Sequence, residues 1–296
     1  MSQYLDDKSF LSPVLTQQEG HMILQNVKKQ NKIKYLNIDT RFQGDYNLNK
    51  LATLTYNLPQ KIAEVKSIVV RSVEIPMSFH SFSLNRGNTY MKIDNSSVVI
   101  PNYSYTTNDN NLKTQINNKF PTNFTVDISQ NRTTFTNTSS TLTRKIYFDV
   151  DVNGGFNKYN LKSTLGWSLG YRLPEYSVLP NKSLVAEGLV DINPIRYLFL
   201  VVDEFRQSNP NSFISPLSNG YISKNILARI TINTTIYPFG SILPANIFNG
   251  FLLSDQRYYS GKTDIQKLQI QLVDEWGILV DLNQLDFSFC LEIECE

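Results

Sequence analysis

The clearest pattern in the chain is the alternation of apolar and polar residues in its last part, residues 251–296. The alternation covers residues 265–272, breaks at residues 274–277 and resumes over residues 278–293. Successive side chains of a β-strand point to opposite faces of the sheet, so a period of two is typical of strands. This pattern therefore predicts a run of strands with a tight turn between them.

Shorter runs predict further strands along the rest of the chain. The strongest in the N-terminal half, residues 65–76, ends at Pro76, which cannot donate a hydrogen bond to a sheet. Residues 197–202 are almost continuously apolar, as in a strand that is buried on both faces. The other predicted strands cover residues 34–39, 51–56, 89–93, 97–100, 124–128, 133–138, 144–152 and 226–236.

One helix is predicted near residues 108–120. Asn108 can cap its start, apolar residues then recur at helical spacing, and Pro121 ends the run. No segment repeats at a fixed period, which disfavours solenoids and propellers. A single short helix among more than a dozen strands predicts an all-β fold class.

The distribution of these elements divides the chain into four parts. Residues 1–33 are polar, show no strand alternation and are interpreted as an N-terminal arm that lies on a neighbouring subunit or folds back on its own domain. Residues 34–153 form an N-terminal β block, residues 154–193 connecting loops, and residues 194–296 a C-terminal β block. Alternatively, everything after the arm is one domain, because β-sandwiches often exceed about 200 residues.

Composition and charge narrow the function classes. A formal net charge of +2 over 296 residues argues against a dedicated nucleic-acid-binding protein, which usually has a strongly basic face. No apolar run approaches the roughly 18–20 residues that cross a membrane, so no membrane span is expected. The N-terminus also lacks the layout of a secretory signal, which favours a cytosol-like folding compartment.

Few residues suggest catalysis or metal binding. Cys290 and Cys295 are separated by an odd offset, which places them on opposite faces of a strand, so they are expected to stay reduced. His21 and His80 lie near neither cysteine, and no zinc-site spacing or phosphate-binding glycine loop occurs. We therefore predict no catalytic residue, no cofactor and no metal site, and the chain is not expected to be an enzyme.

Two groups of carboxylates leave an alternative open. The first group, around the C-terminal turn, could form a calcium site or an acid/base pair, but turn formation and solvent exposure are favoured. The same preference holds for the pair after the buried strand. These residues are Asp274, Glu275, Asp281 and Asp286 in the first group, and Asp203 and Glu204 in the second.

Aromatic and basic residues in the arm and loops are the candidate interface residues. Such residues are enriched at protein interfaces, although they can also pack back onto their own domain or stack on nucleic acid. The interface interpretation is favoured because no basic groove accompanies them. The candidates are Lys28, Lys29, Lys32, Trp167, Tyr171, Arg172, Tyr176, Phe213, Tyr221, Arg257, Tyr258 and Tyr259.

Four segments together resemble a minor capsid protein family of the nucleocytoplasmic large DNA viruses. Residues 35–42 are similar to its opening Y-L-N-I-D-S-R-F strand, and residues 65–76, with Gly87-Asn88 following, resemble its V-x-S-I-x-L-x-S-x-E-I-P segment. Residues 165–172 resemble L-G-F-x-L-G-F-R. Residues 265–293 resemble the closing block, which includes D-E-x-G and V-D-L-N.

The resemblance implies a structural virion protein with a jelly-roll β-sandwich, built as one elaborated jelly roll or two in tandem. It implies a minor capsid component that cements or supports capsomers of the major capsid protein in an icosahedral shell, located in the virion capsid and assembled in the host cytoplasm. The implied partners are the major capsid protein, other minor capsid proteins and further copies of the chain. The alternatives are a penton protein at the vertices, a jelly-roll module that binds glycans or a receptor, and a β-sandwich hydrolase.

Overall fold

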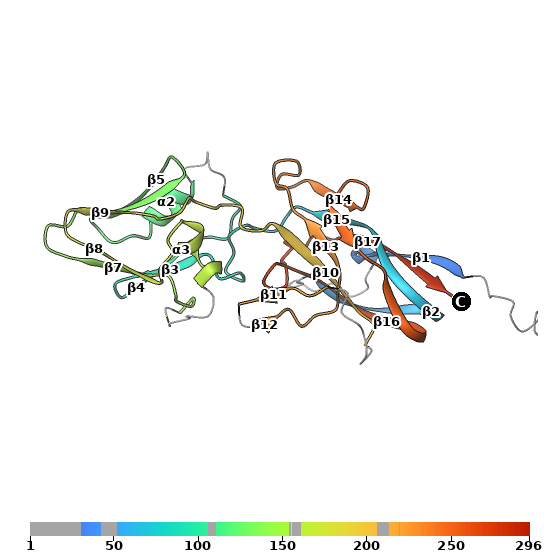
Figure 1. Cartoon of the computed structure of the whole chain (residues 1–296). Helices are drawn as coiled ribbons and strands as arrows, with labels where there is room; N and C mark the ends of the chain where they lie inside the picture. Colours follow the sequence, from blue (N-terminus) through green and yellow to red (C-terminus); the bar gives the residue numbers. More distant parts are fainter. Residues whose placement is uncertain are drawn as a thin grey trace, which may run out of the picture.

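The computed structural model describes residues 31–42, 52–105, 111–153, 155, 161–205, 213–218 and 220–296. It consists of two β bodies joined side by side, a smaller one on the left of Figure 1 and a larger one on the right. Most of the N-terminal arm, including Lys28 and Lys29, lies outside the described residues. Within the described part, no helix is long and apolar enough to cross a membrane.

The larger body is an eight-stranded antiparallel sheet in the order β1-β17-β2-β16-β10-β13-β15, with β14 also paired to β2. It wraps around one core of aliphatic side chains and phenylalanines. Its strands are β1 (Lys32–Asp39), β2 (Thr53–Pro76), β10 (Tyr197–Asp203), β13 (Ile226–Thr231), β14 (Ile242–Asn246), β15 (Leu252–Ser254), β16 (Arg257–Val273) and β17 (Ser288–Cys295).

Strand β2 organises this body because it pairs with three other strands. Its first part lies beside β16, and its last part lies between β17 and β14. Residues 51–56 and 65–76 were expected as two strands. Residues 53–56 and 65–76 belong to this one continuous strand, Ala52 precedes it, and Leu51 lies outside the described residues. The register shifts between Tyr258 and Lys267 in β16, opposite the middle of β2, and such irregularities bend strands enough to close a sheet around a core.

The alternation of apolar and polar residues in the C-terminal part produces strands with one buried face, as predicted. Every second residue of β17 is buried, including Phe289 and Ile293, while the residues between them are partly exposed. Cys290 and Cys295 fall on opposite faces, and both are free thiols. The buried run of β10 is confirmed as well, because only its two end residues are partly exposed.

The smaller body packs two antiparallel sheets around a separate, aromatic core. Phe135 lies at its centre, stacked on Tyr171 with ring centroids 4.9 Å apart and on Phe124 at 5.7 Å. One sheet contains β4 (Ser96–Val99), β3 (Tyr90–Ile93), β7 (Arg144–Tyr147) and β8 (Glu175–Val178), in that order. The other contains β5 (Phe124–Ser129), β6 (Arg132–Asn137) and β9 (Lys182–Val185).

Short elements complete the fold. The predicted helix is present as α2 (Asn111–Asn117), while its expected cap, Asn108, lies outside the described residues. A second, four-residue helix was not predicted; it begins where the Thr164 side chain accepts a hydrogen bond from the backbone of Trp167. The remaining elements are that helix, α3 (Leu165–Ser168), with η1 (Thr40–Phe42), η2 (Leu161–Ser163), β11 (Pro216–Leu217) and β12 (Gly220–Tyr221).

The predicted all-β fold class is confirmed, because antiparallel sheets with only short helices make up the described residues. The jelly-roll β-sandwich, as one elaborated roll or two in tandem, stays a prediction. The expected division at residues 153 and 194 is wrong, because β1 and β2 pair with the last strands of the chain. Residues 82–192 form the smaller body as an insertion between β2 and β10, so the two bodies are nested rather than tandem. Residues 154–193, expected as connecting loops, supply α3, β8, β9 and part of the smaller core.

The ion pair between β2 and β17 predicts an acid-sensitive contribution to stability. Arg71 donates two hydrogen bonds to Glu292, at 2.8 and 2.6 Å, and these lower the pKa of Glu292. As pH falls, the unfolded chain therefore takes up this proton before the folded protein does. The contribution is complete above the usual glutamic-acid pKa of about 4.3 and is lost as pH falls through the folded value.

We expect Glu292→Gln to lower the free energy of unfolding by up to about 1 kcal/mol at neutral pH, because the pair is partly exposed. The difference from the wild type should shrink as pH falls below the usual glutamic-acid pKa of about 4.3. Urea unfolding at several pH values measures both effects. A difference that stays constant with pH would show that Glu292 does not carry this sensitivity.

Candidate interface at the junction of the two bodies

Arg86 forms an ion-pair clasp between the two bodies. It lies on the loop that precedes β3 in the smaller body, and only 10% of its side chain is exposed. Its Nη1 donates to Asp274 at 2.6 Å and its Nη2 to Glu275 at 2.9 Å, both on the turn after β16 in the larger body. We refer to Arg86, Asp274 and Glu275 as the clasp.

Both loops of the clasp are held in shape by side-chain hydrogen bonds. Asn88 is buried, accepts a hydrogen bond from the backbone of Ser83 and donates one to the Ser81 carbonyl. On the other side, Asp274 accepts backbone hydrogen bonds from Trp276 and Ile278, both at 2.9 Å. Each loop also contains a glycine with positive φ, a conformation that other residues rarely adopt. The clasp is thus built from preorganised turns.

Burial sets the electrostatics of the clasp. Burial raises the pKa of Asp274 and of Glu275, and the nearby Arg86 opposes the rise at each. Burial also lowers the pKa of Lys224, against the pull of Asp274. Both Asp274 oxygens already accept hydrogen bonds, so this carboxylate acts as a turn former and ion-pair partner.

The other carboxylates in question also have structural contacts. Asp281 accepts a backbone hydrogen bond from Asn283, and Asp286 accepts one from the Thr40 hydroxyl. Asp203 accepts the backbone N–H of Phe205. Among the described residues, no group of three or more histidines, cysteines or acids is arranged to hold a metal ion. The absence of catalysis, cofactor and metal stays a prediction.

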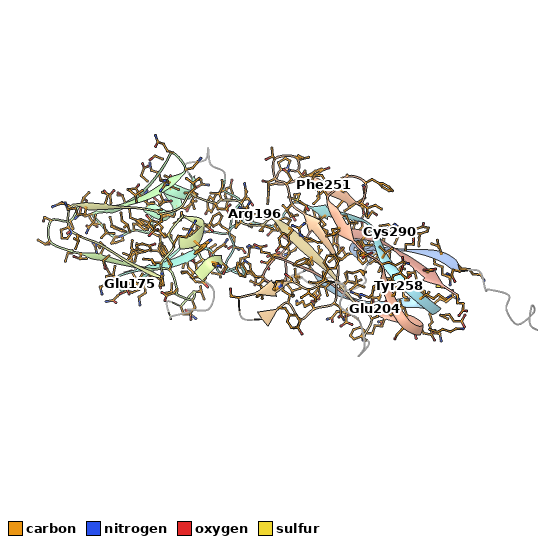
Figure 2. The ribbon with its side chains drawn as sticks, in the orientation of Figure 1. Glu175, Arg196, Glu204, Phe251, Tyr258 and Cys290 are labelled. Carbon is orange, nitrogen blue, oxygen red and sulfur yellow. The ribbon has the colours of Figure 1, made fainter. Side chains whose placement is uncertain are left out.

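Two of the clefts at the junction bear on function. One, of about 290 Å³, is lined by both tryptophans of the chain, Trp167 and Trp276, and by charged residues that include Arg196. Figure 2 shows Arg196 where the two bodies meet. The other cleft, of about 300 Å³, has a lining without any charged residue and is called the junction cleft below. Beside it, His80 stacks on Phe239 of the larger body, with ring centroids 5.5 Å apart, and its pKa is lowered by burial.

Three of the candidate interface residues are buried within the chain, as in the alternative that such residues pack back onto their own domain. Tyr171 is fully buried in the smaller core, where burial strongly raises its pKa, and Tyr176 is 8% exposed. Arg257 is 1% exposed and donates to Glu204 at 2.9 Å and to three backbone carbonyls, including that of Val202 at 2.8 Å. A buried charge needs such partners. Sequence alone did not reveal them, because Glu204 is 53 residues away.

The other interface candidates within the described residues are at least partly exposed. Trp167 is partly exposed, with the Arg172 guanidinium over its ring at 4.4 Å. Tyr221 and Tyr258 are 58% and 62% exposed, and Figure 2 shows Tyr258 on the larger body. Lys32 is exposed at the start of β1, while Phe213 and Tyr259 are partly buried. Their role as interface residues stays a proposal.

Sequence reasoning missed two features of the structure, the clasp arginine and an apolar surface. It did not single out Arg86, although the adjacent Gly87-Asn88 pair is part of the family-like pattern. It also missed the apolar surface of the segment 230–254, which contains no charged residue and exposes Phe248 to 93%. The length of that uncharged run in a chain with 18% charged residues was the available signal.

No family model and no curated protein matches the sequence. Among solved structures, the chain is similar to the mavirus penton protein, with a TM-score of 0.44 and 11% identity, covering 90% of this chain and 100% of that chain. It is also similar to a chain of the Sputnik virophage in a 3.5 Å cryo-EM structure, with a TM-score of 0.42 and 14% identity, covering 89% and 98%. Values this low leave the role of the chain to be argued from its own residues.

Removal of Arg86 tests the clasp. We expect Arg86→Met to lower the free energy of unfolding by about 3 kcal/mol, because two carboxylates at the junction lose their counter-charge. Asp127→Asn is the matched control: it removes the exposed Lys113–Asp127 pair and should cost at most about 0.5 kcal/mol. Denaturant unfolding measures both variants, and equal effects would contradict a stabilising clasp.

Gly166 provides a test of the L-G-W-S-L-G-Y-R segment. A methyl group at this position would overlap the buried Phe148 ring, so Gly166→Ala should destabilise the protein by about 1–3 kcal/mol. In an unobstructed helix the same change is stabilising by about 0.5–1 kcal/mol. The sign of the change in the free energy of unfolding therefore shows whether Phe148 blocks this position. Gly261→Ala is the control, because nothing lies near its Cβ position. Thermal unfolding of the two variants should separate them clearly.

Proposed function

We propose that the chain is a structural protein of a virus particle, a minor capsid component that supports or cements capsomers of an icosahedral shell. The observation that carries the proposal is where the four family-like segments lie in the fold. Residues 35–42 cover most of β1 and η1, residues 65–76 the central part of the large sheet, and residues 165–172 the wall of the smaller core. Residues 265–293 include the clasp turn and most of β17.

The chemistry of the side chains supports the same proposal. Acids that could serve catalysis are engaged in structure: Asp274 and Glu275 bind Arg86, and the buried Glu204 binds Arg257. Large apolar side chains are instead exposed on the surface, including Ile214 at 76% and Phe248 at 93%. Exposed apolar surface of this kind marks contacts with other proteins more often than it marks active sites.

The same proposal names the partners of the chain and its position in the shell. The partners would be the major capsid protein, other minor capsid proteins and further copies of this chain, in a shell assembled in the host cytoplasm. A position beneath the capsomers is the first choice, and a penton position at the vertices is the alternative.

A glycan- or receptor-binding role is the second candidate, and the tryptophan-lined cleft favours it. Aromatic rings beside hydrogen-bonding groups offer a stacking surface and polar partners to a ligand in a cleft of this size. Glycan-array binding that disappears in Trp167→Ala, but persists in the exposed-tyrosine variant Tyr221→Ala, would support this candidate.

Cross-linking mass spectrometry on purified particles tests the shell role. Exposed lysines on both bodies, Lys61, Lys119 and Lys182, are suitable reporters. We expect stoichiometric incorporation and links to the major capsid protein, and link patterns together with copy number distinguish a vertex from a position beneath capsomers. Absence of the chain from particles, or its presence without links to shell proteins, would overturn the proposal.

A further inference from the structure

The turn between β14 and β15 presents an apolar knob. Phe248 at its tip is 93% exposed, and the preceding Ile247 is 39% exposed. The turn is held by the side chains of Asn246 and Asn249: the first accepts the backbone N–H of Phe248 at 2.9 Å, and the second donates to the Pro244 carbonyl at 2.5 Å. An exposed phenylalanine on a turn fixed in this way is preorganised to anchor a contact.

The segment that carries the knob has no charge of its own. Residues 230–254, which run from β13 through β14 to β15, contain no charged side chain. Ile242, at the start of β14, is 64% exposed, and Pro244 is exposed two residues further on. Figure 1 shows β14 and β15 together on the upper side of the larger body. Interface cores are typically depleted of charge and rich in aromatic residues, as this surface is.

The junction cleft is uncharged and large enough to receive an aromatic side chain. Its volume is about 300 Å³, and a cavity of about 150 Å³ is enough to hold benzene. Uncharged residues of both bodies and of the connections between them line it: Met77, Phe79, Ser81, Ser104, Tyr105, Ile192, Asn193, Thr234, Thr235, Pro238 and Phe239. An aromatic ring that enters this cleft leaves no charge unpaired.

We propose that Phe248 of one copy of this chain enters the junction cleft of a second copy. A second copy is the occupant because the apolar knob and the uncharged cleft, half lined by apolar and aromatic residues, are both present on every copy. They also lie on either side of one strand: Phe239 of the cleft precedes β14, and Phe248 follows it. The five residues of β14 separate them by about 16 Å, so one copy can offer both surfaces at once.

With both surfaces on one copy, two copies can bind each other symmetrically, or each copy can bind the next one head to tail. If two β14 strands lie antiparallel across a two-fold axis, each knob faces the cleft of the other copy, and the exposed Ile242 and Pro244 lie between the two contacts. If the contact runs head to tail, the copies form a closed ring or an open filament. In either case the same two surfaces meet, and loss of one of them weakens the assembly.

The inference deepens the proposed shell role and rests on it for its biological setting. Its test uses only the purified full-length chain, whereas the shell role is tested on particles. A protein that self-associates through these surfaces but is absent from particles would overturn the shell role alone. A monomeric protein that is present in particles and linked to shell proteins would overturn this inference alone.

The experiment is sedimentation velocity of the wild type and three variants over a concentration series. We expect the wild type to self-associate, and Phe248→Asp and Thr235→Arg each to weaken association at least tenfold, because each places a charge in the contact. Thr235 is an exposed residue of the cleft lining, so both substitutions leave the core intact. Leu179→Asp is the control: Leu179 is 57% exposed on the smaller body, outside both surfaces, and its substitution should leave association unchanged.

A mixture of the two weakened variants gives the decisive result. In a mixed pair, the aspartate at position 248 of one variant faces the arginine at position 235 of the other. In the second contact of the pair, the unchanged Phe248 of the Thr235→Arg variant enters the unchanged cleft of the Phe248→Asp variant. We therefore expect the mixture to recover association, with circular dichroism confirming that each variant is folded. A monomeric wild type, full association of Phe248→Asp, equal weakening by Leu179→Asp, or a mixture that stays dissociated would each overturn the inference.

Discussion

The pairing of β2 with β16, β17 and β14 is the constraint on which the rest of the structure depends. It joins the beginning of the described chain to its end in one sheet, so the chain must leave the larger body after β2 and return to it before β10. The smaller body is therefore an insertion with a core of its own, held by two crossings of the chain. A sheet closed by such long-range pairs gains its burial late in folding, because distant segments must meet first.

Two crossings alone would leave the bodies free to move against each other, and the clasp of Arg86, Asp274 and Glu275 restrains that motion. The ion pairs are largely shielded from solvent, so they act more strongly than a surface pair would. The clasp also explains why the D-E-x-G turn and the Gly87-Asn88 pair accompany each other in this chain: they build opposite sides of one contact. Similarly, the glycines of L-G-W-S-L-G-Y-R are explained by packing, since Gly166 lies against Phe148 and Gly170 against Gly188.

These arrangements separate the polar chemistry of the molecule from its apolar surface. The most deeply buried ion pairs join Arg257 to Glu204 within the larger body and Arg86 to Asp274 across the junction, where they specify geometry. The exposed surface of the segment 230–254 is uncharged and apolar, which suits association with other protein subunits. A shell component needs this combination, because it has to be rigid within itself and adhesive towards its neighbours.

The sequence by itself determined many of the strands, the all-β class, the helix at α2, the buried character of β10 and the opposite orientation of the two cysteines, but not the strands β8 and β9. Each of these depends on the periodicity of neighbouring residues, which is a local property. Only the tertiary structure decided which strands pair, where one core ends and the next begins, and which aromatic and basic residues reach the surface. Tyr171 and Arg257 have the composition of interface residues, but partners far along the chain bury them. Burial and strand pairing depend on contacts between distant segments, and the alternation of residues within one segment does not specify which segment will pack against it.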